Sequence, residues 1–257
     1  MTPILTDPTF YLAALPAVFL VGLSKGGFGG AMALLGVPLL SLVVPPVQAA
    51  AILLPILIVM DMVSLWAWRG FFDPRTLSIM LPGALLGIAI GWATAAVVTE
   101  GHVRVIVGLV ALAFFLRWLS EKLGGRDRIA SHSAPRGLFW GATAGFTSFV
   151  AHAGGPPYQV YALPLKQDPK LYTGTSVIFF AVVNAVKLIP YFALGQFDQA
   201  NLTASLMLVP LAPVATLTGV WVIKRMKPAV FYPFMYGMVL IVSLKLIHDG
   251  LSDLLGW

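Results

Sequence analysis

The sequence contains no cysteine among its 257 residues, which excludes disulfides, thiolate nucleophiles and cysteine-ligated metals. Charge is also scarce. Asp, Glu, Lys and Arg make up 10% of the chain, whereas soluble domains are about a quarter charged. Hydrophobic residues instead account for 59% of the sequence, and its mean hydropathy is +0.90. This composition is typical of a chain embedded in lipid.

Long stretches of the sequence carry no acidic or basic residue, namely 26–60, 76–99 and 199–223. A helix needs roughly 20 apolar residues to cross a bilayer, and these stretches reach that length. They lack the strict alternation of apolar and polar residues expected of a membrane barrel. The sequence therefore predicts an all-α polytopic membrane bundle. The net charge of +6 fits basic loops that orient such a bundle, and no nucleic-acid partner is expected.

Motifs for catalysis are missing as well. "GLSKGG" is not a phosphate loop, because its lysine precedes the glycine pair, and there is no H-E-x-x-H sequence. The four histidines are scattered along the chain, at positions 102, 132, 152 and 248. We therefore expect no enzyme activity, no metal site and no cofactor.

The apolar segments fall into two similar series. "GFFDPRTL" at 70–77 matches "GQFDQANL" at 195–202, and Pro82 and Gly91 are spaced like Pro210 and Gly219. We interpret this as a duplication, with repeats at 1–121 and 137–257 joined by a basic linker at 122–136. Each repeat is expected to begin with a broken stretch and to continue with three plain crossings. The predicted segments are 8–24 with 26–44, 47–68, 77–99 and 102–120, then 137–150 with 154–165, 171–194, 200–223 and 228–248.

The distribution of basic residues predicts that the second repeat is inverted. If each broken stretch returns to its starting side, both termini lie outside and twelve of the sixteen Lys and Arg lie on the cytoplasmic side. A parallel repeat would place several of them outside, against the positive-inside bias. The twelve residues are Arg69, Arg75, Arg117, Lys122, Arg126, Arg128, Arg136, Lys166, Lys170, Lys224, Arg225 and Lys227.

Both broken stretches are rich in glycine: "SKGGFGG" at 24–30 and "TSFVAHAGGPPYQ" at 147–159. The start of a helix after a break exposes N–H groups at the positive end of the helix dipole, which binds anions. Paired breaks in two inverted halves point to the binding site of a transporter. We expect a small-anion site formed by the backbone of 26–30 and by Lys25, Gly26, Gly27, Ser148, His152, Gly154, Gly155, Asn184 and Lys187.

Several of these residues have alternative interpretations. Lys25 either binds the anion or pairs with Asp61, the one carboxylate deep in an apolar segment. His152 and Asp61 are candidates for proton coupling, and His152 is equally well explained as a hydrogen-bonded packing residue. Glycines that recur every fourth position are expected to mediate helix packing; they are Gly83, Gly87 and Gly91, and Gly137, Gly141 and Gly145.

The chain resembles the TauE/SafE family of sulfite exporters, also called TSUP, over nearly its whole length. The resemblance rests on "GLSKGGFGG", "GFTSFVAHAGGPPYQVYAL" and "TGTSVIFFAVVNAVKLIPY". It implies a multi-pass permease of the bacterial inner membrane that carries sulfite or organosulfonates such as sulfoacetate.

Together these observations predict a secondary transporter of small sulfur-containing anions that works by alternating access. The alternatives are a passive anion channel and a transporter of another small carboxylate or oxyanion. Its expected partners are the anion and the lipid bilayer, with protons as a further candidate. A homodimer is also left open.

Overall fold

A computed structural model describes residues 7–28, 35–95, 97–125, 129–193 and 199–256, and these ranges contain helices and no strand. Their order follows the predicted segments closely, although many helices begin or end a few residues away from the expected positions. The helices are α2 (Pro8–Gly27), α3 (Gly36–Leu40), α4 (Pro46–Ala67), α5 (Pro74–Ala93), α6 (Glu100–Leu123), α7 (Ala134–Ala151), α8 (Gly155–Ala162), the 3-10 helix η2 (Leu163–Leu165), α9 (Pro169–Ala193), α10 (Gln199–Leu208), α11 (Leu211–Arg225) and α12 (Pro228–Leu255).

Local sequence signals set the starts of several helices. The side chain of Asp7 accepts a hydrogen bond from the Thr9 amide at 2.9 Å and caps α2. Asp73 caps α5 in the same way, through the amides of Arg75 and Thr76. A proline stands in the first turn of α2, α4, α5, α7 and α12, where its missing N–H costs nothing.

Within the described ranges, five helices are long and apolar enough to cross a membrane: α2, α5, α6, α9 and α12. The pair α10–α11 brings the number to six if it is counted as one span. Large apolar side chains such as Leu12, Ile106 and Leu206 face outward and are more than 60% exposed, as expected at a lipid surface. The predicted polytopic helical bundle is confirmed.

One crossing differs from its prediction. The segment 200–223 was expected to be a plain helix, but α10 ends at Leu208 and α11 begins at Leu211, with a 48° bend between them. Pro210 lies at the bend, where its ring removes one backbone hydrogen bond and clashes with the preceding turn. The prediction of an unbroken helix here is wrong.

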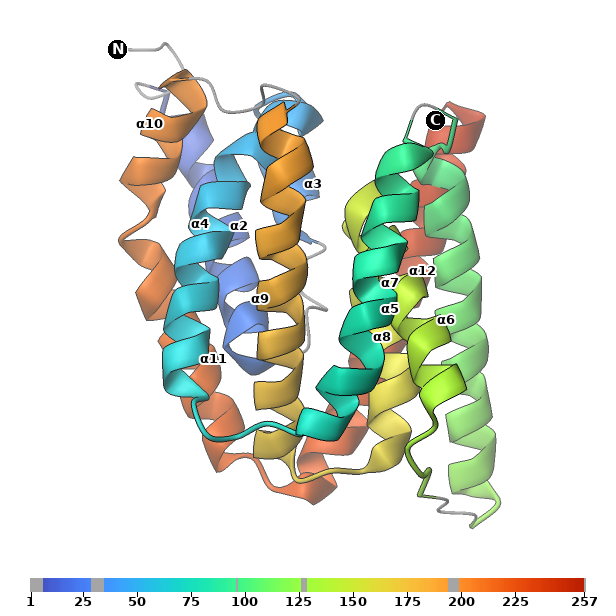
Figure 1. Cartoon of the computed structure of the whole chain (residues 1–257). Helices are drawn as coiled ribbons and strands as arrows, with labels where there is room; N and C mark the ends of the chain where they lie inside the picture. Colours follow the sequence, from blue (N-terminus) through green and yellow to red (C-terminus); the bar gives the residue numbers. More distant parts are fainter. Residues whose placement is uncertain (1–6, 29–34, 96, 126–128, 194–198, 257) are drawn as a thin grey trace.

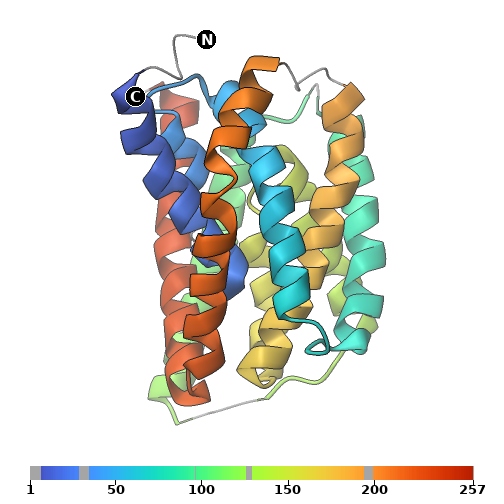
Figure 2. The same cartoon turned by 90° about the vertical axis from the view of Figure 1, so that its left-hand side faces the viewer.

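The connections alternate between the two ends of the bundle. In Figures 1 and 2, α2 begins and α12 ends at the upper end. The lower end carries the connections from α4 to α5, from η2 to α9 and from α11 to α12, and there α6 ends and α7 begins. The basic residues Arg69, Lys166 and Lys227 lie in these lower connections. The described chain therefore has a basic end, opposite the start of α2.

Glycines allow three helix pairs to pack closely. A Cβ at Gly87 of α5 would lie 2.0 Å from the carbonyl oxygen of Ala142 on α7, and one at Gly145 would lie 2.0 Å from that of Ala84. The pair α2 and α11 makes a similar contact, because a Cβ at Gly26 would lie 2.2 Å from the Thr216 oxygen. Helices α6 and α12 meet through Gly108 and Gly250. The predicted packing role of the regularly spaced glycines is confirmed.

Candidate functional site

The second predicted break is a hairpin that returns to its starting side. Helix α7 ends at Ala151, His152 adopts a left-handed conformation with φ 52° and ψ 20°, and α8 begins at Gly155. The two ends of the hairpin are joined by hydrogen bonds. The Ala130 amide donates to the Pro164 oxygen at 2.8 Å, and the Ser133 amide donates to the Tyr161 hydroxyl at 3.4 Å. The hairpin therefore enters and leaves at the basic end.

The first break lies between α2 and α3. The structure describes the chain up to Phe28 and again from Leu35, so the expected backbone ligands at 29 and 30 lie outside the described residues. Helix α3 returns beside α2, since a Cβ at Gly36 would lie 2.4 Å from a methyl group of Val21. Gly26 and Gly27 pack against α11, and the Gly26 oxygen accepts a hydrogen bond from the Trp68 indole at 2.9 Å. These two predicted ligands lie outside the cavity lining described next.

A cavity of about 90 Å³ lies between the two breaks and is also lined by α4 and α9. Such a volume accommodates several water molecules or a small ion. The cavity brings together most of the predicted site residues from distant parts of the chain. These are Lys25, Asp61, Ser148, His152, Gly154, Gly155, Asn184 and Lys187.

Lys25 and Asp61 form an ion pair in this cavity. The lysine Nζ lies 2.6 Å from Asp61 Oδ1, and both side chains are nearly buried, with exposed fractions of 11% and 8%. Asn184 Nδ2 donates to the other carboxylate oxygen of Asp61 at 2.8 Å. Of the two interpretations of Lys25, the structure contains the pair with Asp61. The positive charge at the first break is therefore neutralised locally.

Lys187 differs from Lys25 in its contacts. It is 2% exposed, and its Nζ donates to the backbone oxygen of Ser148 at 3.0 Å and to the Ser148 hydroxyl at 3.1 Å. Both acceptors are uncharged, and in the described ranges no carboxylate lies within ion-pair distance of this ammonium group. An ammonium group is costly to bury without a counter-charge. When protonated, Lys187 therefore brings to the cavity a positive charge that no described carboxylate neutralises by direct contact.

Two contacts to backbone oxygens in the site have the same sequence separation. Ser64 Oγ donates to the Lys25 backbone oxygen at 2.9 Å, and Lys187 Nζ donates to the Ser148 backbone oxygen at 3.0 Å. Each contact joins residues 39 positions apart. The contact between Asp61 and Asn184 joins residues 123 positions apart, and the same offset relates Lys25 to Ser148 and Ser64 to Lys187.

Other lining residues were absent from the predicted site. The Ser24 hydroxyl is buried and lacks a hydrogen-bond partner among the described residues, and it lines the cavity next to Lys25. On α9, the lining residues Ser176, Phe180 and Asn184 recur every fourth position and so share one helix face. Counting back along α9 from Asn184 would have identified Ser176.

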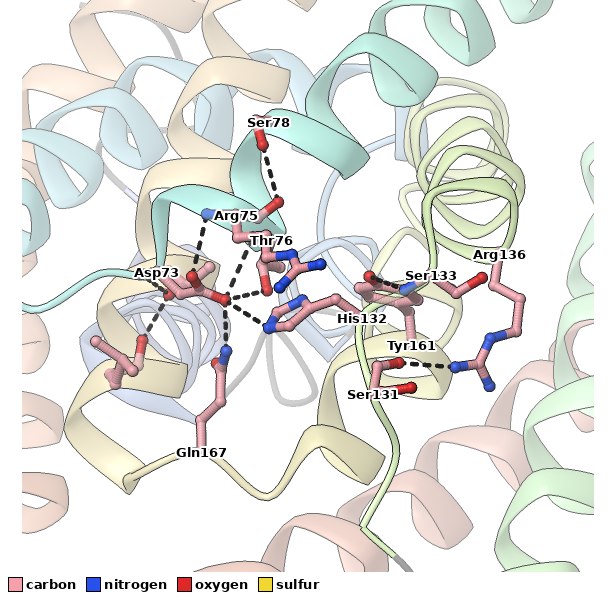
Figure 3. A network of polar contacts seen from close by, with 12 residues as sticks. Asp73, Arg75, Thr76, Ser78, Ser131, His132, Ser133, Arg136, Tyr161 and Gln167 are labelled. Carbon is pink, nitrogen blue, oxygen red and sulfur yellow. Dashed lines mark hydrogen bonds and ion pairs between the residues drawn. The ribbon is translucent and has the colours of Figure 1, made fainter.

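A second polar cluster, centred on Asp73, lies at the basic end and is shown in Figure 3. Asp73 Oδ2 accepts hydrogen bonds at 2.6 Å from the Thr76 hydroxyl and from the Gln167 amide, and His132 Nε2 lies 3.4 Å away. The Asp73 amide in turn donates to the Thr175 hydroxyl at 2.8 Å. Partial burial raises the pKa of the Asp73 carboxyl, but these hydrogen bonds and His132 outweigh burial, so its pKa lies below the usual value. The cluster joins the start of α5 to the linker and to α9.

Comparison with known families decides the identity of the chain at the family level. The family described as "Sulfite exporter TauE/SafE" matches residues 14–246. The chain belongs to the TauE/SafE family. No curated protein and no solved structure matches it. Family membership and the apolar helices make it a membrane protein from a transporter family for sulfite-type anions.

Proposed function

We propose that the chain is a secondary transporter of small sulfur-containing anions, sulfite or an organosulfonate, and that the cavity between the two breaks is its binding site. The observation that carries the proposal is Lys187, a buried amine whose hydrogen bonds within the described residues go to uncharged oxygens. Charged residues inside a membrane protein are costly and typically mark an ion or substrate pathway. An anion in the cavity would supply the missing counter-charge.

Neighbouring donors favour an oxyanion as the ligand. Gly154 and Gly155 lie at the start of α8, where their own backbone N–H groups and the helix dipole favour negative charge. The unpartnered Ser24 hydroxyl and the His152 imidazole line the same cavity. Several donors around one cation suit a group with several oxygens, such as a sulfonate or sulfite. Because Asp61 holds the Lys25 ammonium group, Lys187 is the cation assigned to the anion.

The proposed mechanism is alternating access between two inverted repeats, 1–121 and 137–257. The equal separation of 39 residues in the Ser64–Lys25 and Lys187–Ser148 contacts supports the duplication. The helix packing supports it too, because the broken stretch of each half packs on the other half, α2 on α11 and α7 on α5. With the basic end in the cytoplasm, the positive-inside bias places both termini outside a bacterial inner membrane.

The driving ion and the assembly are further parts of this proposal. Asp61 and His152 line the cavity and are the candidates for coupling transport to protons. Asp61 accepts hydrogen bonds at both oxygens, so protonation would break its pair with Lys25. A homodimer stays a prediction.

The proposal is tested by sulfite uptake into proteoliposomes with wild-type protein, Lys187→Gln and the control Lys224→Gln. Lys224 also donates to a backbone oxygen, that of Ala67, but it is exposed at the basic end. A hydrogen bond to a charged group contributes about 1.5–3 kcal/mol, so Lys187→Gln should weaken anion affinity by about 10–100-fold while the control is unchanged. Unaltered affinity in a folded Lys187→Gln protein would refute the site.

Counterflow in the same vesicles separates a carrier from a passive anion channel. A carrier exchanges labelled external anion against trapped unlabelled anion, so label accumulates transiently. A channel only dissipates the gradient. If the protein transports the anion but shows no counterflow, it is a channel and not a carrier.

A further inference from the structure

We infer that the cavity selects a singly charged organic anion with a short apolar substituent over an inorganic or organic dianion. This inference rests on the proposed anion-binding function and specifies its substrate class. Two independent features of the cavity support it: the number of uncompensated charges in its lining, and the separation of apolar from polar lining residues along the surrounding helices.

The charged groups of the lining leave room for one negative charge. Lys25 and Asp61 neutralise one another at 2.6 Å, and Lys187 adds a single positive charge. With Lys187 protonated and the His152 imidazole neutral, the described lining residues carry one net positive charge. A monoanion would balance it, whereas a dianion would bring a second buried charge without a partner. Unpaired buried charges cost several kcal/mol, so the second charge should be rejected.

The apolar part of the lining comes mainly from the first half of the chain. Val21, Val37, Leu53, Leu54 and Leu57 line the cavity from α2, α3 and α4. On α4, Leu57 precedes Asp61 by one helical turn and Leu53 by two, which places them about 6 and 12 Å from Asp61 along the axis. These leucines therefore line the cavity on the side of Asp61 that faces the start of α4.

The polar donors are contributed mainly by the second half. Ser148, His152, Gly154, Gly155 and Lys187 line the cavity from α7, the hairpin turn, the start of α8 and α9. If the charged group of the anion binds at Lys187, the leucines of α4 contact either water or a hydrocarbon group of the anion. Burying each methylene contributes about 0.8 kcal/mol, or a factor of about four in affinity. Alkanesulfonates should therefore gain affinity with each added carbon.

Calorimetric titration of the purified full chain with a ligand series tests this inference without any mutation. Methanesulfonate, ethanesulfonate and propanesulfonate carry one charge each and differ by single methylenes. We expect their affinity to rise about fourfold per methylene. Ethane-1,2-disulfonate has the carbon chain of ethanesulfonate with a second charge, and we expect it to bind at least about tenfold more weakly.

The outcomes separate the inference from the proposed function. Suppose that sulfite binds saturably, but that affinity does not rise along the alkanesulfonate series or that the disulfonate binds as tightly as ethanesulfonate. Either result would overturn the inference but would not contradict the anion site. If neither sulfite nor any sulfonate binds to folded protein, the proposed function itself fails. Both results are obtained from the unmodified chain.

A variant pair locates the apolar contact. Leu57→Ala shortens a lining side chain, and we expect the gain per methylene to fall from about fourfold toward twofold. Leu65→Ala is the matched control, because Leu65 lies two turns further along α4, is 38% exposed and does not line the cavity. It should keep the wild-type gain. An equal loss in both variants would refute the assignment of Leu57.

Discussion

Replacement of Lys25 by glutamine should destabilise the protein more than simultaneous removal of both charges of its ion pair. The Lys25 ammonium group is the charged partner of Asp61, whose second oxygen is bonded to the neutral Asn184 amide. In Lys25→Gln, a carboxylate that is 8% exposed keeps its charge and loses its counter-ion. In the double variant Lys25→Gln/Asp61→Asn, no uncompensated charge remains at this position.

The magnitude follows from the burial of the pair. Removal of one partner from a buried ion pair costs about 3–5 kcal/mol, because it leaves the other charge desolvated. For a chain of this size, each kcal/mol changes Tm by about 2–4 °C, so Lys25→Gln should melt roughly 10 °C below wild type. Replacement of both charged groups by neutral ones of similar volume is often nearly neutral. The double variant should therefore recover more than half of the loss.

Thermal melting of detergent-purified protein measures this difference, and sulfite titration of the same samples tests the role of Lys25. We expect the double variant to bind the anion within about threefold of wild type, because Lys187 remains. If the double variant melts as low as Lys25→Gln, the ion pair does not explain the stability. If the stable double variant loses the anion, Lys25 is a ligand after all.

Two further predictions concern helix packing and the basic end. Gly145→Ala should lower Tm, because the added Cβ would lie 2.0 Å from the Ala84 oxygen and overpacking costs about 1–3 kcal/mol. Gly237 is a helical glycine at which an added Cβ would meet nothing within 4 Å, so Gly237→Ala should be neutral or stabilising. The pKa of Asp73 is lowered in the folded protein. Its contribution to stability is therefore complete at pH values above the ordinary Asp pKa, about 3.9, and is lost as pH falls through the lowered pKa. Melting curves of wild type and Asp73→Asn should therefore differ near neutral pH and converge as pH falls from about 4 through the lowered pKa. A constant difference at all pH values would contradict this assignment.

Much of the helix arrangement was predictable because uncharged apolar runs have few alternatives in a membrane. The bend between α10 and α11 was not predicted, although its proline is visible in the sequence. Pro82 lies within the continuous helix α5, whereas Pro210 separates α10 from α11. Both prolines remove a backbone hydrogen bond, and whether the helix then bends depends on the packing of its neighbours. That packing is a property of the whole bundle.

The polar half of the cavity was also predictable, because glycines, prolines and charges stand out in apolar segments. The apolar half of the cavity was not predictable from the sequence. Helix α4 is hydrophobic on all sides, so periodicity does not distinguish Leu57, which lines the cavity, from Leu65, which is more exposed. The partner of Lys25 was undecided for a related reason, since Asp61 lies 36 residues away and only the fold brings the two together.

Under the proposed duplication, equivalent positions of the site differ in charge. The offset of 123 residues relates Lys25 to Ser148, Asp61 to Asn184 and Ser64 to Lys187. In each pair one residue is charged and the other is neutral and polar, so each keeps a hydrogen-bonding side chain at an equivalent position. The two charges of the first half cancel, and the second half keeps one cation. An inverted repeat therefore need not bind a symmetric ligand, and this asymmetry fits an anion with one charged and one apolar end.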